Sequence, residues 1–109
     1  MIQEIVLCDD HQYNVLIGKS AIDNDVIIKM SHPEDIWFHF QNVSGPHIIL
    51  QSSGNRIDKK VLYEVASKLF DHKPKVPKNQ GVIYTEVKNV KLTKTPGTVI
   101  TRKIKILKF

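Results

Sequence analysis

Apolar and polar residues alternate in two short segments at the start of the chain. Residues 3–8 and 13–18 are rich in β-branched and other apolar side chains, and the turn-forming sequence DDHQ stands between them. Because every second side chain of a strand lies on the same face, this pattern predicts a β-hairpin.

A four-residue spacing of apolar residues follows. Ser20 can cap a helix that has Asp23 at its third position, and Ile22, Val26 and Met30 then repeat at about one helical turn. We expect a short amphipathic helix with these three residues on its apolar face, ended by the sequence SHP.

Residues 36–41 alternate again. Their even-numbered apolar side chains should lie on one face of a sheet, with Trp37 and His39 on the other. A Gly-Pro turn precedes a return strand at residues 47–51. His47 therefore shares the face of Trp37 and His39 if the two strands pair in the expected register.

The clearest helical pattern covers residues 57–70, where Asp58 can act as the N-terminal cap. Its apolar stripe consists of Val61, Leu62, Val65, Ala66, Leu69 and Phe70. Residues 71–80 contain two prolines and three lysines without any period, which predicts an exposed, mobile, basic loop.

Two further strands are predicted at residues 82–90 and 99–107, with a Pro-Gly turn between them. The predicted order is ββαββαββ. We expect one α+β domain spanning residues 1–109, with a mainly antiparallel sheet and both helices packed on one face.

Charge is distributed unevenly along the chain, whose net charge is +5. Residues 1–55 hold two lysines against seven acids, whereas residues 56–109 hold fourteen basic residues against four acids. A basic surface attracts polyanions through counterion release, and nucleic acid is the commonest polyanion of the cytosol. This pattern favours nucleic-acid binding over a basic face that only promotes solubility.

The chain begins without the features of a secretory signal, and no segment approaches the roughly 20 apolar residues of a membrane span. Its single cysteine, Cys8, cannot form an internal disulfide and is typical of a small buried residue. We therefore expect a cytoplasmic protein that does not associate with membranes.

Asp35, His39 and His47 are the candidate chemical groups. A carboxylate and two imidazoles can bind a divalent metal or act as acid and base. Their spacing matches no metal or catalytic motif, and the chain has no Gly-rich phosphate loop. We assign no catalytic residue, metal or cofactor, and expect the histidines to form hydrogen bonds within the sheet or to contact a ligand without chemistry.

The basic residues of the second half form a candidate binding surface. Lys103 and Lys105 alternate with Ile104 and Ile106, so their ammonium groups should point to one face. The candidate nucleic-acid-binding residues are Lys73, Lys75, Lys78, Lys88, Lys91, Lys94, Arg102, Lys103 and Lys105. Lysines attract phosphates without reading bases, so binding should depend strongly on salt.

Aromatic residues provide a second kind of contact with nucleic acid. Trp37, Tyr63 and Tyr84 are candidates to stack on an unpaired base, although such residues more often belong to a core.

Three groups of residues resemble a known family. DIWFHF at 35–40 and GPHIIL at 45–50 look like the D-I-W-F-H … G-S-H-V-x-L core of the R domain of NFACT proteins. The strings IGK and ND upstream, and VIYTEVKNVK at 82–91 with PGTV at 96–99, are similar to the segments that flank this core. The motif positions are Asp35, Trp37, His39, Gly45, His47, Lys91 and Gly97.

The resemblance implies an RNA-binding domain, in a family whose full-length members act with tRNA and the large ribosomal subunit on stalled translation. We expect a stand-alone R domain, without the N-terminal domain to which the family's peptide-tailing activity belongs. The chain departs from the family pattern at Pro46, where Ser is usual, and at Leu92, where Lys is common.

From these residues we expect an RNA-binding module for tRNA or ribosomal RNA, linked to ribosome-associated quality control and possessing no enzymatic activity. Two alternatives stay open. One is an enzyme that modifies or hydrolyses RNA or a nucleotide with Asp35, His39 and His47. The other is a protein-interaction module that docks on a ribosomal protein or an NFACT partner.

Overall fold

The elements of the chain follow the predicted order as far as the second helix. The computed structural model describes residues 1–52, 55–77 and 79–109. Its elements are β1 (Ile2–Cys8), β2 (His11–Ile17), α1 (Ala21–Met30), β3 (Ile36–Phe40), β4 (Ile48–Leu50), α2 (Lys59–His72), β5 (Val82–Glu86), the 3-10 helix η1 (Val87–Asn89), β6 (Val90–Leu92), β7 (Val99–Thr101) and β8 (Lys105–Leu107). None of the described helices is long and apolar enough to cross a membrane.

Most strands belong to one antiparallel sheet with the order β1-β2-β4-β3-β5-β8. The first hairpin closes at Asp9 and Asp10, whose φ values of 50° and 65° suit the tight turn that a paired hairpin needs. β3 and β4 pair with Trp37 opposite Ile49. The α+β class, the antiparallel sheet and this register are therefore confirmed.

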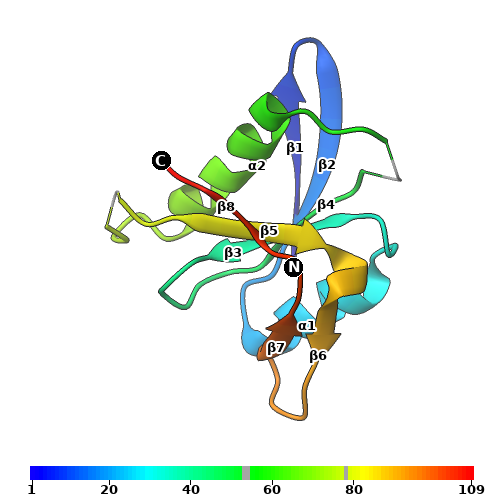
Figure 1. Ribbon diagram of the computed structural model, residues 1–109, viewed down its shortest axis with the longest axis vertical. Coiled ribbons are helices and arrows are strands. Elements are labelled where there is room, and N and C mark those ends of the chain that lie inside the picture. The colour runs from blue at the N-terminus through cyan, green and yellow to red at the C-terminus, as the bar shows by residue number, and fades with distance from the viewer. Residues whose placement is uncertain (53–54, 78) are drawn as a thin grey trace.

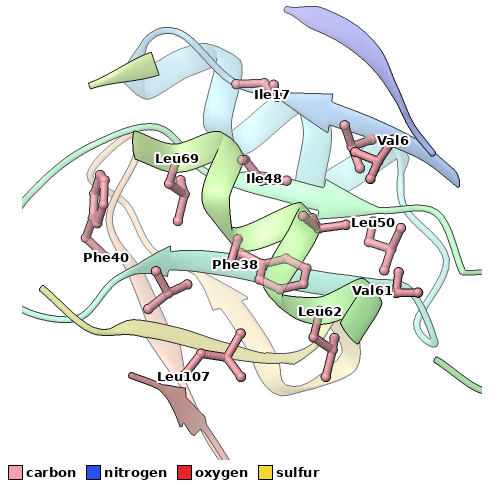
Figure 2. Packing of buried hydrophobic residues seen from close by; sticks show 14 of the residues in the cluster. Val6, Ile17, Phe38, Phe40, Ile48, Leu50, Val61, Leu62, Leu69 and Leu107 are labelled. Atoms are coloured by element: carbon pink, nitrogen blue, oxygen red, sulfur yellow. The ribbon is translucent and has the colours of Figure 1, made fainter. Parts of the chain in front are cut away.

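Helix α2 covers one face of the sheet. The Asp58 carboxylate accepts a hydrogen bond from the Val61 amide at 3.2 Å, which confirms the predicted cap. Figure 2 shows Phe38 and Leu50 of the sheet packed against this helix, and Leu107 of the last strand joins the same cluster. Each fully buried side chain of this size contributes roughly 1.5–3 kcal/mol.

Helix α1 lies on the opposite face, so the expectation that both helices cover one face is wrong. Leu16, Trp37 and Ile49 point away from α2 and form a second cluster with Ile27 and Ile28 of α1. Strands β6 and β7 form a small separate sheet at the same end of the molecule as α1 (Figure 1). Both faces of the main sheet are therefore packed against a helix, α2 on one side and α1 on the other.

The apolar stripe predicted for α1 is also wrong. Ile22, Val26 and Met30 are 70%, 40% and 51% exposed, while the helix buries Asn24, Ile27 and Ile28. The Ser20 cap is correct, because its hydroxyl accepts a hydrogen bond from the Asp23 amide at 3.1 Å. The sequence of α1 offers two apolar stripes, and contacts with the rest of the fold select between them.

The two long strands predicted in the last third of the chain are each divided. The segment 82–90 leaves the main sheet at Val87, whose amide donates to the Asp35 carbonyl at 2.8 Å. The segment 99–107 breaks at Lys103, which has a φ of 54°. As a result, β5 and β8 pair in the main sheet, whereas β6 and β7 pair with each other.

The segment 71–80 is less exposed than predicted. Its first two residues complete α2, and Val76 joins the core beneath that helix. The Gln80 side chain is buried and accepts a hydrogen bond from the Asn42 amide at 2.6 Å. The prediction of an exposed loop over the whole segment is therefore wrong, and Lys78 lies outside the described residues.

Candidate functional site

Segments that lie far apart in the sequence meet around one pocket of about 850 Å³ on the α1 side of the sheet. We call it the motif pocket. Its lining comprises residues 17–21 and 44–47, residues 96–99, and the side chains of Asn24, Trp37, His39, His72, Ile83 and Thr101. All three groups of residues that carried the family resemblance therefore contribute to a single site.

Two neighbouring residues of α1 hold the loops of the motif pocket in place. The Asn24 side-chain oxygen accepts a hydrogen bond from the His47 amide at 3.1 Å, and the Asp25 carboxylate accepts one from the Gly97 amide at 3.0 Å. Sequence reasoning quoted this Asn-Asp pair only as part of the resemblance. The burial of Asn24 is visible only in the tertiary structure, so the resemblance was the one available signal.

Glycine is required where the chain approaches α1 most closely. A Cβ atom on Gly18 would lie 2.1 Å from the Asn24 side-chain oxygen. A Cβ atom on Gly97 would lie 2.8 Å from that of Ala21, and Gly97 also has a φ of +78°. Both glycines therefore allow the loops to close against the helix.

Three aromatic rings form the floor of the motif pocket. Trp37 stacks on His39 with ring centres 5.8 Å apart, and His47 meets both rings edge-on. The indole N–H of Trp37 donates to Nδ1 of His47 at 3.2 Å. Since Nδ1 accepts this hydrogen bond, the neutral His47 ring carries its proton on Nε2.

Two histidines of the pocket, His39 and His47, are held in their neutral forms. Burial, with a smaller contribution from His39, lowers the pKa of His47 from 6.5 to about 3. Burial also lowers the pKa of His39, although the carbonyls of Phe40 and Gly45 oppose that change. Near neutral pH the imidazole groups of His39 and His47 are therefore uncharged.

Asp35 does not join the two histidines. Its carboxylate accepts a hydrogen bond from the His32 amide at 2.9 Å, in the turn that leads into β3. Among the described residues that line the motif pocket, none is Asp or Glu. No group of three or more His, Cys, Asp or Glu residues in the described part of the chain is placed to hold a metal ion. The arrangement lacks the carboxylate that the enzyme alternative needed.

Comparisons with known proteins identify the family of the chain. Residues 5–102 match the family described as the NFACT protein RNA binding domain. The chain belongs to this family. Mouse (Mus musculus) coiled-coil domain-containing protein 25 is 34% identical over 87 residues, which cover 74% of this chain and 42% of that protein. The archaeal Rqc2 homolog aRqcH of Methanocaldococcus jannaschii is 34% identical over 83 residues, covering 74% of this chain and 12% of that protein.

A solved structure shares the NFACT-R fold. The C-terminal part of the fibronectin/fibrinogen-binding protein from Streptococcus suis matches with a TM-score of 0.84 at 24% identity, over 99% of this chain and 45% of that chain. The chain thus spans less than half the length of these relatives. The family and the fold assigned from sequence motifs are confirmed.

The basic residues proposed for this NFACT-R domain do not gather at the motif pocket. Lys103 and Lys105 line a second pocket, of about 670 Å³, together with Lys59 and Tyr84. Tyr84 stacks on Phe38, so this second pocket opens toward the α2 side of the sheet. The strict alternation assumed for the two lysines is interrupted at Lys103, but both still reach the same cavity.

The other candidate cations are spread over the surface. Lys73 caps α2 and donates a hydrogen bond to the Ser44 carbonyl, which places it at the edge of the motif pocket. Lys88 lies 3.6 Å from the Glu86 carboxylate. Four more are exposed, namely Lys75, Lys91, Lys94 and Arg102. Lys19, which sequence reasoning did not select, is the lysine that lines the motif pocket in the described chain.

The three stacking candidates are partly or fully buried. Trp37 is 1% exposed, so it supports the pocket and does not stack on a base. The Tyr63 hydroxyl donates to the Lys108 carbonyl at 3.1 Å. Tyr84 is half-buried and lines the second pocket together with Lys59, Lys103 and Lys105.

Proposed function

We propose that this domain binds tRNA or ribosomal RNA and that the motif pocket is its specific site. The observation that carries the proposal is the convergence of five of the seven motif positions on one pocket. Trp37, His39, Gly45, His47 and Gly97 all line it, although they span much of the sequence. Residues shared for packing alone would not need to surround an accessible cavity.

The electrostatics of the pocket support an anionic ligand. Its described lining contains one lysine and no carboxylate, and Lys73 stands at its edge. The exposed cations of the second half of the chain add a wider field that attracts a polyanion before it docks. The pocket would select the RNA feature, and the surrounding charge would supply much of the affinity.

We further propose a role in ribosome-associated quality control, in the cytoplasm and near the large ribosomal subunit. The support is the similarity to an archaeal Rqc2 homolog, of which this chain covers 12%. An isolated R domain would contribute binding and position rather than the activity of a full-length protein.

Fluorescence anisotropy of labelled tRNA, single-stranded RNA and duplex DNA tests the proposal, with each ligand at about 50 and 200 mM salt. We expect tRNA to bind more tightly than duplex DNA, with affinity falling steeply as salt rises. Equal and weak binding to all three would contradict RNA recognition.

A matched pair of charge reversals locates the site. Lys19→Glu should weaken tRNA binding strongly, because Lys19 lines the motif pocket. Lys29→Glu is the control: it makes the same charge change in the last turn of α1, at an exposed position outside the pocket. Lys103→Glu combined with Lys105→Glu tests the second pocket. If only this double variant lost binding, the second pocket would be the RNA site.

One observation favours a second candidate function, docking on a protein. Ile22, Val26 and Met30 form an exposed apolar stripe on α1, which a soluble surface does not require. Cosedimentation with purified large ribosomal subunits tests this role, using Ile22→Ser with Met30→Ser. If the double variant no longer cosediments but binds tRNA with unchanged affinity, protein docking is supported. If it cosediments as well as wild type, the stripe is not the docking surface.

A further inference from the structure

The first turn of α1 presents unpaired donors to the motif pocket. The first amides of a helix have no partners within it, and they carry its positive dipole end. Ser20 satisfies the Asp23 amide, and the Asn24 amide makes the first helical bond to the Ser20 carbonyl. In the described chain, the amides of Ala21 and Ile22 have no protein hydrogen bond, and Ala21 lines the pocket.

A buried side chain supplies another unpaired donor. His47 is 3% exposed, and its Nδ1 is occupied by the Trp37 indole. Among the described residues, every side-chain nitrogen or oxygen that is shielded from solvent has a hydrogen-bond partner. Nε2 of His47 makes no hydrogen bond with the protein, so this atom must be exposed. Nε2 therefore reaches the pocket, where it carries a proton and can only donate.

Backbone hydrogen bonds connect the His47 segment to the start of α1. The Gly18 amide donates to the His47 carbonyl at 3.0 Å, and the His47 amide donates to the Asn24 side chain at 3.1 Å. The His47 backbone is thus held between the strand end before α1 and the first turn of α1. Two independent features, the N-terminus of α1 and the buried imidazole of His47, therefore line the same cavity.

The acids near this point are already engaged. The Asp23 carboxylate accepts a hydrogen bond from the Lys19 amide at 3.0 Å and pairs with the amino group of Met1 at 2.9 Å. The Asp25 carboxylate accepts from the Gly97 amide. The pocket itself is lined by Lys19 and by hydroxyl groups, with no carboxylate among its described lining.

We propose that the first turn of α1 and Nε2 of His47 together bind a phosphate group. Several donors converge on one pocket, and a phosphate has enough oxygen atoms to accept from all of them at once. The inference rests on the proposed function only for the source of the phosphate. If the domain binds RNA, the phosphate belongs to an RNA chain. If it does not, the ligand is a free phosphate or a nucleotide. A carboxylate-lined pocket would have repelled this ligand.

Nuclear magnetic resonance of the ¹⁵N-labelled protein tests the site directly. The probes are inorganic phosphate, a trinucleotide RNA with a 5′-phosphate, and the same RNA with a 5′-hydroxyl. We expect saturable shifts of the Ala21 and Ile22 amides and of the indole N–H of Trp37, which is the single tryptophan of the chain. Shifts with the 5′-phosphorylated RNA alone identify a terminal phosphate, equal shifts with both RNAs identify a backbone phosphate, and saturation by inorganic phosphate identifies a free group.

Two substitutions remove one donor each. Ala21→Pro deletes one amide N–H at the first helical position, where proline is tolerated, and the extended Ser20 before it suits a following proline. Ala21→Gly keeps the amide and is the matched control. His47→Asn keeps an acceptor close to the Trp37 indole but does not extend to the position of Nε2. We expect Ala21→Pro and His47→Asn to weaken phosphate binding by about tenfold, and Ala21→Gly to leave it nearly unchanged.

The results separate this inference from the proposed function. If tRNA binds in the anisotropy experiment but no phosphate-bearing probe shifts these resonances, the phosphate site is wrong and RNA binding stands. If tRNA does not bind but inorganic phosphate shifts Ala21 and Trp37, the phosphate site stands and RNA binding is wrong. Equal affinities for Ala21→Pro and Ala21→Gly would also overturn the inference.

Discussion

Acidification should destabilise this fold largely through His47. Its pKa is about 3 in the folded protein, against 6.5 ordinarily, because the ring is buried. At any pH between these values, His47 is therefore mostly protonated in the unfolded chain and mostly neutral in the folded chain. The stability that depends on a neutral His47 is fully present above about pH 6.5 and is lost progressively as the pH falls toward the folded pKa.

The size of the effect follows from the proton balance. When only the unfolded state binds a proton, the free energy of unfolding falls by about 1.36 kcal/mol for each pH unit of acidification. At about pH 5, roughly 1.5 units below the ordinary pKa, His47 alone removes on the order of 2 kcal/mol. Burial lowers the pKa of His39 as well, which adds a loss of the same sign. A domain of this size has a total stability of only about 5–15 kcal/mol.

Carboxylates do not obscure this window. Burial raises the pKa of Glu4, but hydrogen bonds with α2 side chains bring it below 4.5 overall. A hydrogen bond from the N-terminal amino group of Met1, and a second from the Lys19 amide, lower the pKa of Asp23 from 3.8. Both groups contribute stability that is lost only as the pH falls through these lower values, so the loss between about pH 7 and pH 5 reports the histidines.

Urea unfolding at about pH 7 and pH 5, followed by the fluorescence of Trp37, measures the effect. Wild type should lose roughly 2 kcal/mol or more between the two conditions, and His47→Asn should lose about 2 kcal/mol less than wild type. If both proteins lost the same amount of stability, the reasoning from the buried neutral imidazole would be refuted.

Three further predictions test the packing of the fold. Ile27→Ala should lower the free energy of unfolding by about 2–4 kcal/mol because Ile27 is fully buried, whereas the exposed Ile22→Ala should change it by less than about 0.5 kcal/mol; urea titration compares the two. Gly97→Ala should cost on the order of 1–3 kcal/mol in thermal unfolding, since its φ is +78° and its new Cβ would meet Ala21. Burial raises the pKa of the Cys8 thiol, so a thiol reagent should modify Cys8 only as fast as the hairpin opens; rapid labelling of the native protein would contradict this.

Local sequence patterns were sufficient wherever a feature depends on neighbouring residues. The Ser20 and Asp58 caps bond to amides three residues away, and the turn at Asp9 and Asp10 joins strands that are adjacent in sequence. The alternation of residues 36–41 likewise separates Phe38 from Trp37 without knowledge of the partners. These features, and the motifs that identify the family, lie within short stretches of the chain.

The candidate site was only half visible in the sequence. The motif residues Trp37, His39 and His47 were selected, and they do line one pocket. Asn24 and Lys19 were not selected, because nothing in the local pattern of a short helix says that its first turn will face a loop from β3 and β4. The basic residues chosen by charge were those of the second pocket and the outer surface, since charge counts carry no information about faces.

By itself, then, the sequence determined the elements up to α2, the α+β class, the family and the core of the motif. The tertiary structure alone decided which stripe of α1 is buried, that the helices cover opposite faces, and where the last strands break. The physical reason is that these outcomes depend on contacts between distant segments. The bond from the His47 amide to Asn24 joins residues 23 positions apart, and Asn24 lies on the buried face of α1 with Ile27, while Ile22 is exposed.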